Sequence, residues 1–137
     1  MTRTLLNVPE QLVATPTYLS ERGTPQSVDD HDGHEIFAWH RPSADPFEIP
    51  RLAGGGVAIR PVVVATDVHA LRQLALSGQG MAFIPEAGFP DPKDPEPLVP
   101  VLPELGRMCP VNVVVPEALA RSAQVRAFQK GVLAFLP

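Results

Sequence analysis

One stretch of the sequence, residues 62–84, constrains the fold more than any other. It opens with a β-branched run, Val62-Val63-Val64-Ala65, typical of a strand that is buried on both faces of a parallel or mixed sheet. Thr66 or Asp67 then offers a helix N-cap, and apolar residues follow at helical spacing. After a Gly-Gln-Gly turn comes a second apolar run, residues 81–84. The order strand, helix, turn, strand predicts a short βαβ unit with a parallel sheet.

Shorter patterns predict the remaining elements. Pro16 suits the first position of a helix and Gly23 suits its end, so residues 17–22 are expected to form a short helix. Residues 40–50 hold three prolines and are expected to form a loop. Apolar runs predict strands at residues 11–14, 35–39, 57–59 and 111–115 (the last one buried), an extended piece at 98–102, and a final helix at 122–136.

Composition excludes several classes of protein. The 137 residues suffice for one domain or two small lobes, and 45% hydrophobic with 19% charged residues is a globular composition. A net charge of −4 excludes a basic footprint for nucleic acid over the whole chain. No apolar run is long enough to span a membrane, and the first residues do not form a secretory signal. The single cysteine, Cys109, fits a reducing compartment, so we expect a cytoplasmic location without membrane contact.

Several segments, taken in order, resemble the effector-binding domain of LysR-type transcriptional regulators. These segments are LVATPTYLSERGTPQSVDDHDGHEIFAW, TDVHALRQLALSGQGMAFIPE, LVPVLPEL, VNVVVPEAL and VRAFQKGVLAFL. No single motif carries the resemblance, whereas their combination and spacing are fairly specific. The resemblance extends over residues 8–136, nearly the whole chain.

The resemblance implies an α/β fold in which a mixed, mostly parallel sheet is flanked by helices. It corresponds to one lobe plus the C-terminal return of a domain similar to type II periplasmic binding proteins, whose two lobes face each other across a cleft. Residues 1–14 would be the first crossover strand with part of the first lobe. Residues 15–84 would form the second lobe. Residues 85–137 would be a proline-rich connector and a C-terminal return of one strand and one helix.

The sequence also departs from the family pattern. The winged helix-turn-helix, the linker helix and the N-terminal half of the first lobe have no counterpart in these 137 residues. Three explanations for these missing parts stay open: a natural truncation, a wrongly assigned start and a deliberately shortened chain. Because the family contacts DNA through the missing module, we expect no direct nucleic-acid contact from this chain.

The candidate ligand-binding residues are Thr15, Thr17, His40, Arg41, Thr66 and Asp67. The start of the helix after Ala65-Thr66-Asp67 offers free backbone N–H groups, which suit a carboxylate. Arg41 could pair with an anionic effector, and His40 could donate a hydrogen bond to it. The resemblance implies that all these residues line one side of the cleft. The alternative is that Thr66 or Asp67 only caps its helix, while His40 and Arg41 are solvated loop residues.

Two other chemistries are less well supported. The run Asp29-Asp30-His31-Asp32-Gly33-His34-Glu35 is rich in metal-ligating side chains, but its spacing matches no closed zinc site and no EF-hand loop, so a solvated turn is expected. Cys109 has no neighbouring histidine to activate it as a nucleophile. We therefore expect no enzyme, no metal and no cofactor.

The sequence thus predicts a regulatory domain that senses a small, anionic metabolite. The signal would pass through lobe closure and dimer geometry. Its partners would be the small-molecule effector and either a second copy of itself or a full-length LysR-type regulator. The alternative is a stand-alone truncated paralogue that acts as a dimerisation module without DNA binding of its own.

Overall fold

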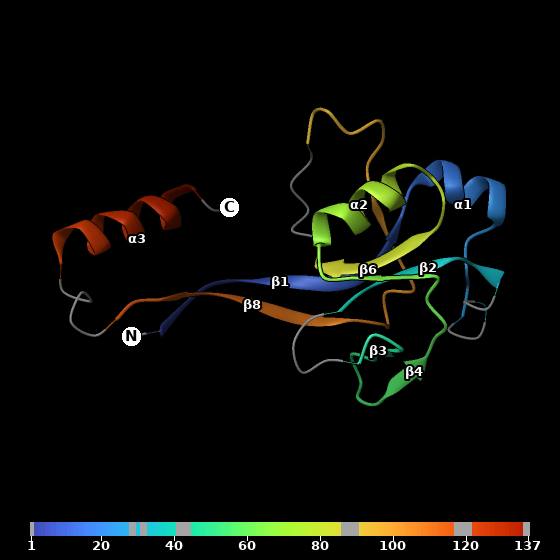
Figure 1. Cartoon of the computed structure of the whole chain (residues 1–137), viewed down its shortest axis with the longest axis horizontal. Coiled ribbons are helices and arrows are strands. Elements are labelled where there is room, and N and C mark those ends of the chain that lie inside the picture. Colours follow the sequence, from blue (N-terminus) through green and yellow to red (C-terminus); the bar gives the residue numbers. More distant parts are fainter. Residues whose placement is uncertain are drawn as a thin grey trace. The chain divides into compact units, whose positions relative to one another are not determined.

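The computed structural model describes residues 2–27, 30, 33–40, 45–85, 91–116 and 122–135. The chain divides into two compact units. Unit 2 comprises Pro9–Met108, and unit 1 comprises Met1–Val8 together with Cys109–Pro137. Figure 1 labels most elements of each unit. None of the helices in the described ranges is long and apolar enough to cross a membrane.

Unit 2 is built on a mixed sheet. Its strands are β1 (Thr2–Ala14, which begins in unit 1), β2 (Ile36–Trp39), β5 (Val63–Ala65), β6 (Met81–Pro85) and β7 (Val99–Val101), in the order β5-β2-β6-β1-β7. Strand β2 is parallel to both β5 and β6, whereas β1 is antiparallel to β6 and to β7. Among these strands, therefore, only β1 runs in the opposite direction. The α/β class with a mixed, mostly parallel sheet is confirmed.

Register defines two edges of this sheet. Ala38 of β2 lies opposite Phe83 of β6, and Leu12 of β1 lies opposite that same Phe83. The carboxyl ends of β2, β5 and β6 therefore lie together, level with Glu10 of β1, and are called the carboxyl edge. The end of β1 at Ala14 lies level with the start of β6, at the amino edge.

Two layers cover the sheet. Helix α2 (Val68–Leu76) packs on one face through Leu71 and Ala75, which are fully buried with Phe37 and Ile84. Burying one leucine side chain in this way contributes about 2 kcal/mol. On the other face lie Tyr18 of α1 (Pro16–Arg22) and a hairpin formed by β3 (Glu48–Pro50) and β4 (Gly56–Ala58).

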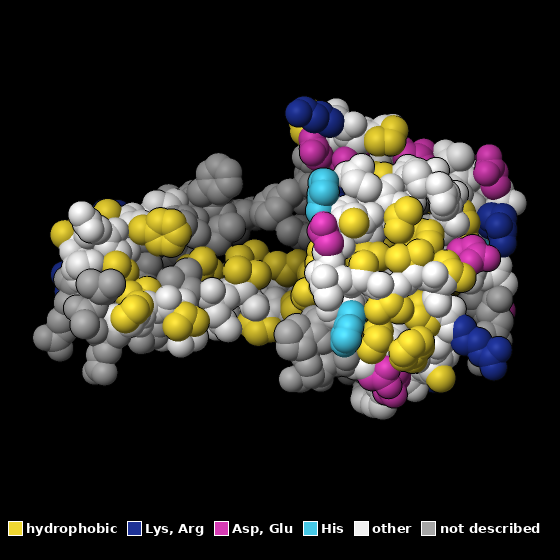
Figure 2. Space-filling model, in the orientation of Figure 1, with side chains coloured by type: hydrophobic (Ala, Val, Ile, Leu, Met, Phe, Trp, Pro, Cys, Tyr) yellow, Lys and Arg dark blue, Asp and Glu magenta, His cyan; other side chains and the backbone are white. Residues whose placement is uncertain are grey.

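The sequence expectations for two of these segments were wrong. Strand β5 is not buried on both faces: it lies at the end of the sheet order, and the side chains of Val62 and Val64 are 56% and 38% exposed. Figure 2 shows hydrophobic side chains gathered on the visible face of unit 2. The expected loop at residues 40–50 contains β3, because its partner β4 and the segment around Leu105 supply its hydrogen bonds.

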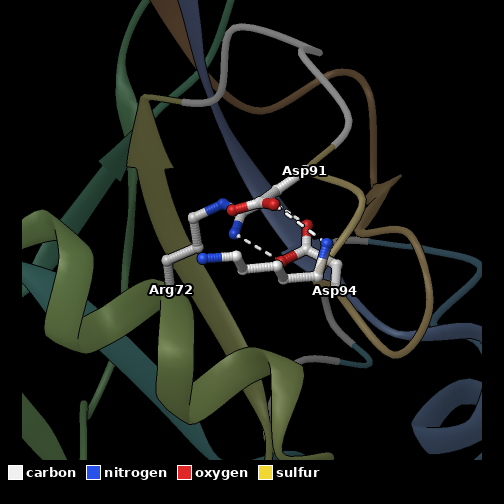
Figure 3. Close-up of polar contacts among 4 residues, drawn as sticks. Arg72, Asp91 and Asp94 are labelled. Carbon is white, nitrogen blue, oxygen red and sulfur yellow. Dashed lines mark hydrogen bonds and ion pairs between the residues drawn. The ribbon is translucent and has the colours of Figure 1, made fainter.

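Within unit 2, side chains connect the described part of the proline-rich segment to helix α2. The guanidinium of Arg72 on α2 donates two hydrogen bonds to the Asp94 carboxylate, at 3.1 and 2.7 Å (Figure 3). Asp91 stabilises the turn that precedes Asp94. Its carboxylate accepts a hydrogen bond from the Lys93 amide, and its carbonyl accepts one from the Asp94 amide. The hydrogen bond from Arg72 holds the pKa of Asp94 below its usual range, although burial opposes the shift.

Unit 1 contains most of β8 (Arg107–Val114), which pairs with β1, and helix α3 (Ala123–Phe135). Within this unit the Thr4 hydroxyl donates a hydrogen bond to Asn112. The expectation of a buried strand at residues 111–115 was wrong for most of its length. Val114 is 73% exposed and Val111 40% exposed, and only Val115 is buried among the described side chains.

Candidate ligand pocket

Three of the predicted site residues lie at the carboxyl edge of unit 2. His40 directly follows β2, and its amide donates a hydrogen bond to the carbonyl of Ala65 at the end of β5. The Trp39 indole donates to the carbonyl of Thr66. Because β2 and β5 are parallel neighbours, their ends bring His40 next to Thr66 and Asp67. The sequence pattern placed these three residues together, as the structure does.

Asp67 is the N-cap of α2. Its carboxylate accepts hydrogen bonds from the amides of His69 and Ala70, at 2.9 and 3.4 Å. An aspartate in this position typically stabilises a helix by about 1 kcal/mol. The expected choice between Thr66 and Asp67 as cap is therefore settled in favour of Asp67. The carboxylate also adds a negative charge at the place where an anion was expected to bind.

Thr15 and Thr17 follow the end of β1 and lie at the amino edge of the sheet, whereas His40 lies at the carboxyl edge. The expectation that both helix starts line one side is therefore wrong, because β1 runs antiparallel to β6 and delivers α1 to the opposite edge. Thr15 is fully buried and caps α1 by accepting from the Tyr18 amide.

The start of α1 already holds a carboxylate from the chain itself. The amide and the hydroxyl of Thr17 donate hydrogen bonds to Glu96, at 3.2 and 2.7 Å. These contacts lower the pKa of Glu96, with the hydrogen bond from the Thr17 side chain as the largest cause, while burial acts in the opposite direction. The donors that the sequence assigned to an effector therefore fasten the proline-rich segment to α1.

Some predicted residues lie outside the described ranges. Arg41 is one of them, and so are His31 and the aspartates at positions 29 and 32 of the acidic run. Of the rest of that run, the Asp30 carboxylate accepts hydrogen bonds from the amides of Gln26 and Ser27. The His34 ring lies 2.7 Å from the Tyr18 hydroxyl. No metal-binding group of side chains occurs among the described residues.

A pocket of about 230 Å³ opens at the carboxyl edge, between the sheet and the β3–β4 hairpin. It lies on the sheet face opposite α2, because Ala38 and Phe83 face away from that helix. Its described lining is Glu10, Ala38, Trp39, Asp45, Pro46, Glu48, Ile49, Pro50, Ile59, Phe83 and Arg107. In open α/β sheets, ligands bind beyond the carboxyl ends of the strands. The pocket has this position.

An ion pair lies in the pocket wall. The Arg107 Nε donates to the Glu10 carboxylate at 2.9 Å, and the Glu10 side chain is only 2% exposed. Gly106, just before β8, allows the backbone of β1 to approach closely. Its φ is +127°, and a Cβ there would meet the Glu10 carbonyl. The Gly106 amide also donates to the Pro50 carbonyl of β3, at 2.7 Å. One glycine therefore joins β1, the hairpin and the start of β8 around the pocket.

Sequence reasoning missed this pocket. Among the described residues, none of the predicted ligand-binding residues lines it. Glu10 offered one signal, since it is the only charged residue between Arg3 and Glu21, but the residue with which it pairs, Arg107, is 97 positions away in the sequence. The ligand-binding roles of Thr15, Thr17, His40, Arg41, Thr66 and Asp67 stay predictions.

The fold and its pocket define a class: α/β domains with a pocket at the carboxyl edge of a mixed sheet. Comparison with known proteins identifies the family. Residues 2–135 match the model of the LysR substrate binding domain, and the chain belongs to this family. The confirmed resemblance thus covers nearly the whole chain.

Relatives of the chain are transcriptional regulators. The chain is 29% identical, over 121 residues, to the HTH-type transcriptional regulator CrgA of Neisseria meningitidis serogroup C (strain 8013). The matched region covers 86% of this chain and 40% of CrgA. The chain therefore spans about two fifths of that relative.

Solved structures show the same fold. The CrgA regulatory domain from Neisseria meningitidis matches with a TM-score of 0.79 and 26% identity, covering 100% of this chain and 69% of that one. The regulatory domain of AphB in Vibrio vulnificus matches with a TM-score of 0.72 and 21% identity, covering 98% of this chain and 68% of that one. The second match concerns the fold alone.

Proposed function

We propose that this chain is the effector-binding part of a LysR-type transcriptional regulator and senses a small metabolite in the pocket of unit 2. The observation that carries the proposal is the position of that pocket, at the carboxyl edge of the sheet, with Arg107 held by the buried Glu10 among apolar side chains of the wall. Ligand sites commonly combine apolar walls with a few fixed polar groups. The family of the chain supports the same function.

The effector would act by shifting the population of two arrangements of the domain. Binding would favour closure of the second lobe, residues 15–84, against the first lobe, and so change dimer geometry. Residues 1–14 would supply the crossover strand and part of the first lobe, and residues 85–137 the connector and the C-terminal return. This chain would act in the cytoplasm, without catalysis and without touching nucleic acid itself. Arg107 supports an effector with a carboxylate, because the guanidinium lies in the pocket wall.

A thermal-shift screen of the full chain tests the sensing function. Neutral, anionic, cationic and zwitterionic metabolites are added at millimolar concentration. We expect members of at least one class to raise the melting temperature with a saturable dose dependence, because a ligand that binds only the folded state stabilises it. The absence of any saturable rise in all four classes would contradict the proposal.

Exposed apolar side chains support the second candidate function, a dimerisation module. In unit 1, Val114 of β8 is 73% exposed and Phe128 of α3 is 60% exposed. Such side chains are typical of association surfaces. The partner would be a second copy of this chain or a full-length LysR-type regulator.

Light scattering at micromolar concentration tests the second candidate. The dimerisation module predicts at least a dimer, and Val114→Ser should weaken it, whereas Gln124→Ser on the exposed surface of α3 should not. A well-folded monomer across the concentration range would contradict this candidate and leave the sensing function in place.

A further inference from the structure

We propose that the pocket of unit 2 binds a small zwitterion: a molecule that carries a carboxylate and an ammonium group on one aliphatic body, as a free amino acid does. The inference rests on the proposed function, since it names the class of effector. It goes beyond the anionic effector that the sequence suggested, because the pocket wall offers groups of both charges.

The carboxylate end would bind Arg107. Among the described residues, the hydrogen bond of this side chain is made by Nε to Glu10, and the side chain is 34% exposed. The two terminal amino groups therefore keep their donors for a ligand, and the buried Glu10 fixes the plane of the guanidinium. Two parallel N–H groups on a fixed plane match a carboxylate in bidentate geometry.

The ammonium end would bind the acidic side of the same pocket. Asp45 and Glu48 both line it, both are exposed, and neither forms an ion pair within the described part of the chain. One oxygen of Asp45 accepts the Phe47 amide, which anchors this carboxylate beside β3. With Glu10 matched by Arg107, two negative charges remain in the described lining. These two carboxylates would repel a purely anionic ligand, whereas they would attract an ammonium group.

The body of the ligand would lie against apolar side chains. Trp39, Ile49, Ile59 and Phe83 line the pocket between its charged groups. A dry cavity of about 150 Å³ holds a benzene molecule. The 230 Å³ pocket therefore has room for a branched aliphatic chain with its two charged groups.

The single tryptophan makes this proposal directly testable. Trp39 is the only tryptophan of the chain and lines the pocket, so a change in its fluorescence reports on binding in or next to this site. Three probes of matched shape are titrated into the full chain: leucine, 4-methylpentanoate (leucine without its ammonium group) and 3-methylbutylamine (leucine without its carboxylate). None of them absorbs at the excitation wavelength of tryptophan.

We expect leucine to change the Trp39 emission saturably and to bind at least about tenfold more tightly than either half-molecule. Each half-molecule lacks one of the two charge-assisted contacts, and tenfold in affinity corresponds to about 1.4 kcal/mol.

Variants assign the two ends. The double variant Asp45→Asn, Glu48→Gln should remove the advantage of leucine over 4-methylpentanoate, because it removes both negative charges that would attract the ammonium group. This variant should fold, because both positions are exposed and the asparagine keeps the acceptor for the Phe47 amide. Arg107→Gln should remove its advantage over 3-methylbutylamine. Circular dichroism checks that this variant folds, because Glu10 is buried. Glu21→Gln, an exposed carboxylate on α1 outside the pocket, is the matched control and should change nothing.

The outcomes separate this inference from the function on which it rests. If 4-methylpentanoate or 3-methylbutylamine binds as tightly as leucine, the zwitterion is wrong and ligand sensing stands. If none of the three probes changes the emission while the thermal-shift screen finds another ligand, again only the zwitterion falls. If both experiments show no binding, both proposals fall.

Discussion

At the scale of single residues, the contact between Tyr18 and His34 makes unit 2 sensitive to pH. The Tyr18 hydroxyl lies 2.7 Å from the His34 Nδ1, and the two rings are tilted, with centroids 5.6 Å apart. Burial lowers the pKa of His34, the nearby Arg22 lowers it further, and Asp30 acts in the opposite direction. Burial likewise raises the pKa of Tyr18. Both residues are therefore held in their neutral forms.

This arrangement predicts acid sensitivity. Because the pKa of His34 is lower in the folded than in the unfolded chain, its contribution to stability is present above the unfolded value, about 6.5, and is lost as the pH falls through the folded value. Replacing His34→Gln should flatten the decline of unfolding free energy below pH 6.5, measured by urea denaturation. His69→Gln, an exposed histidine of α2, is the matched control. Equal pH slopes for His34→Gln and the unchanged chain would contradict the account.

Sequence reasoning succeeded at this scale where chemistry is local. Asp67 could be predicted as a cap because a helix N-terminus selects a short acceptor within three residues. The same logic found donors at Thr17, but not that Glu96, 79 positions away, would accept from them. Glu10 offered only its isolated charge and Arg107 no local signal, since only the pairing of distant strands brings the two together.

At the scale of elements, Gly106 predicts a steep loss of stability when it is substituted. Its φ of +127° is a conformation that L side chains rarely adopt, and a Cβ would meet the Glu10 carbonyl. Gly106→Ala should lower the unfolding free energy by about 3 kcal/mol or more, because strain and a backbone clash add.

Gly78→Ala is the control for conformation without a clash. Gly78 also has a positive φ, +78°, but a Cβ there would meet open space. The expected loss is about 1–2 kcal/mol, for strain alone. Urea denaturation of both variants provides the comparison, and an equal loss at the two glycines would show that Glu10 and Gly106 are not in close contact.

The proline-rich segment supplies the second prediction for elements. The chain has two lysines, Lys93 and Lys130, so a protease specific for lysine cleaves next to the Arg72–Asp94 contact and at one distant site. Removing the guanidinium with Arg72→Gln should speed cleavage after Lys93 several-fold and leave cleavage after Lys130 unchanged. Arg126→Gln on α3 is the charge-matched control. Unchanged cleavage after Lys93 in Arg72→Gln would show that this ion pair does not fasten the segment.

The elements themselves were largely predictable. Helix α2 and strand β6 begin and end within one or two residues of the expected positions, because helical spacing, a cap and a glycine turn define them locally. Strand β4 lies within one residue of the strand predicted at residues 57–59, but β3 and its pairing with β4 were not predicted. Strand β3 has only three residues, and the hairpin depends on distant partners such as Glu104, whose carbonyl accepts from the Leu52 amide. Burial of β5 was overestimated because an apolar run does not tell a central strand from an edge strand.

At the scale of the whole molecule, family and fold could be predicted while the pocket could not. The segments that resemble LysR effector-binding domains extend along the chain, and the match over residues 2–135 confirms them. The pocket lining, in contrast, comes from β1, β2, β3, β6, β8 and the segments around Asp45 and Ile59. A sequence pattern finds residues that are neighbours along one element, whereas this site is assembled by sheet register.

The central claim is that unit 2 binds a small molecule in this pocket. Its most direct test is a two-dimensional ¹H–¹⁵N NMR titration of the full chain with the best compound from the thermal-shift screen. The account predicts saturable shifts centred on the Trp39 indole N–H, the Arg107 Nε–H and the amides of residues 45–50. Shifts that saturate elsewhere, or none at all at millimolar concentration, would contradict it.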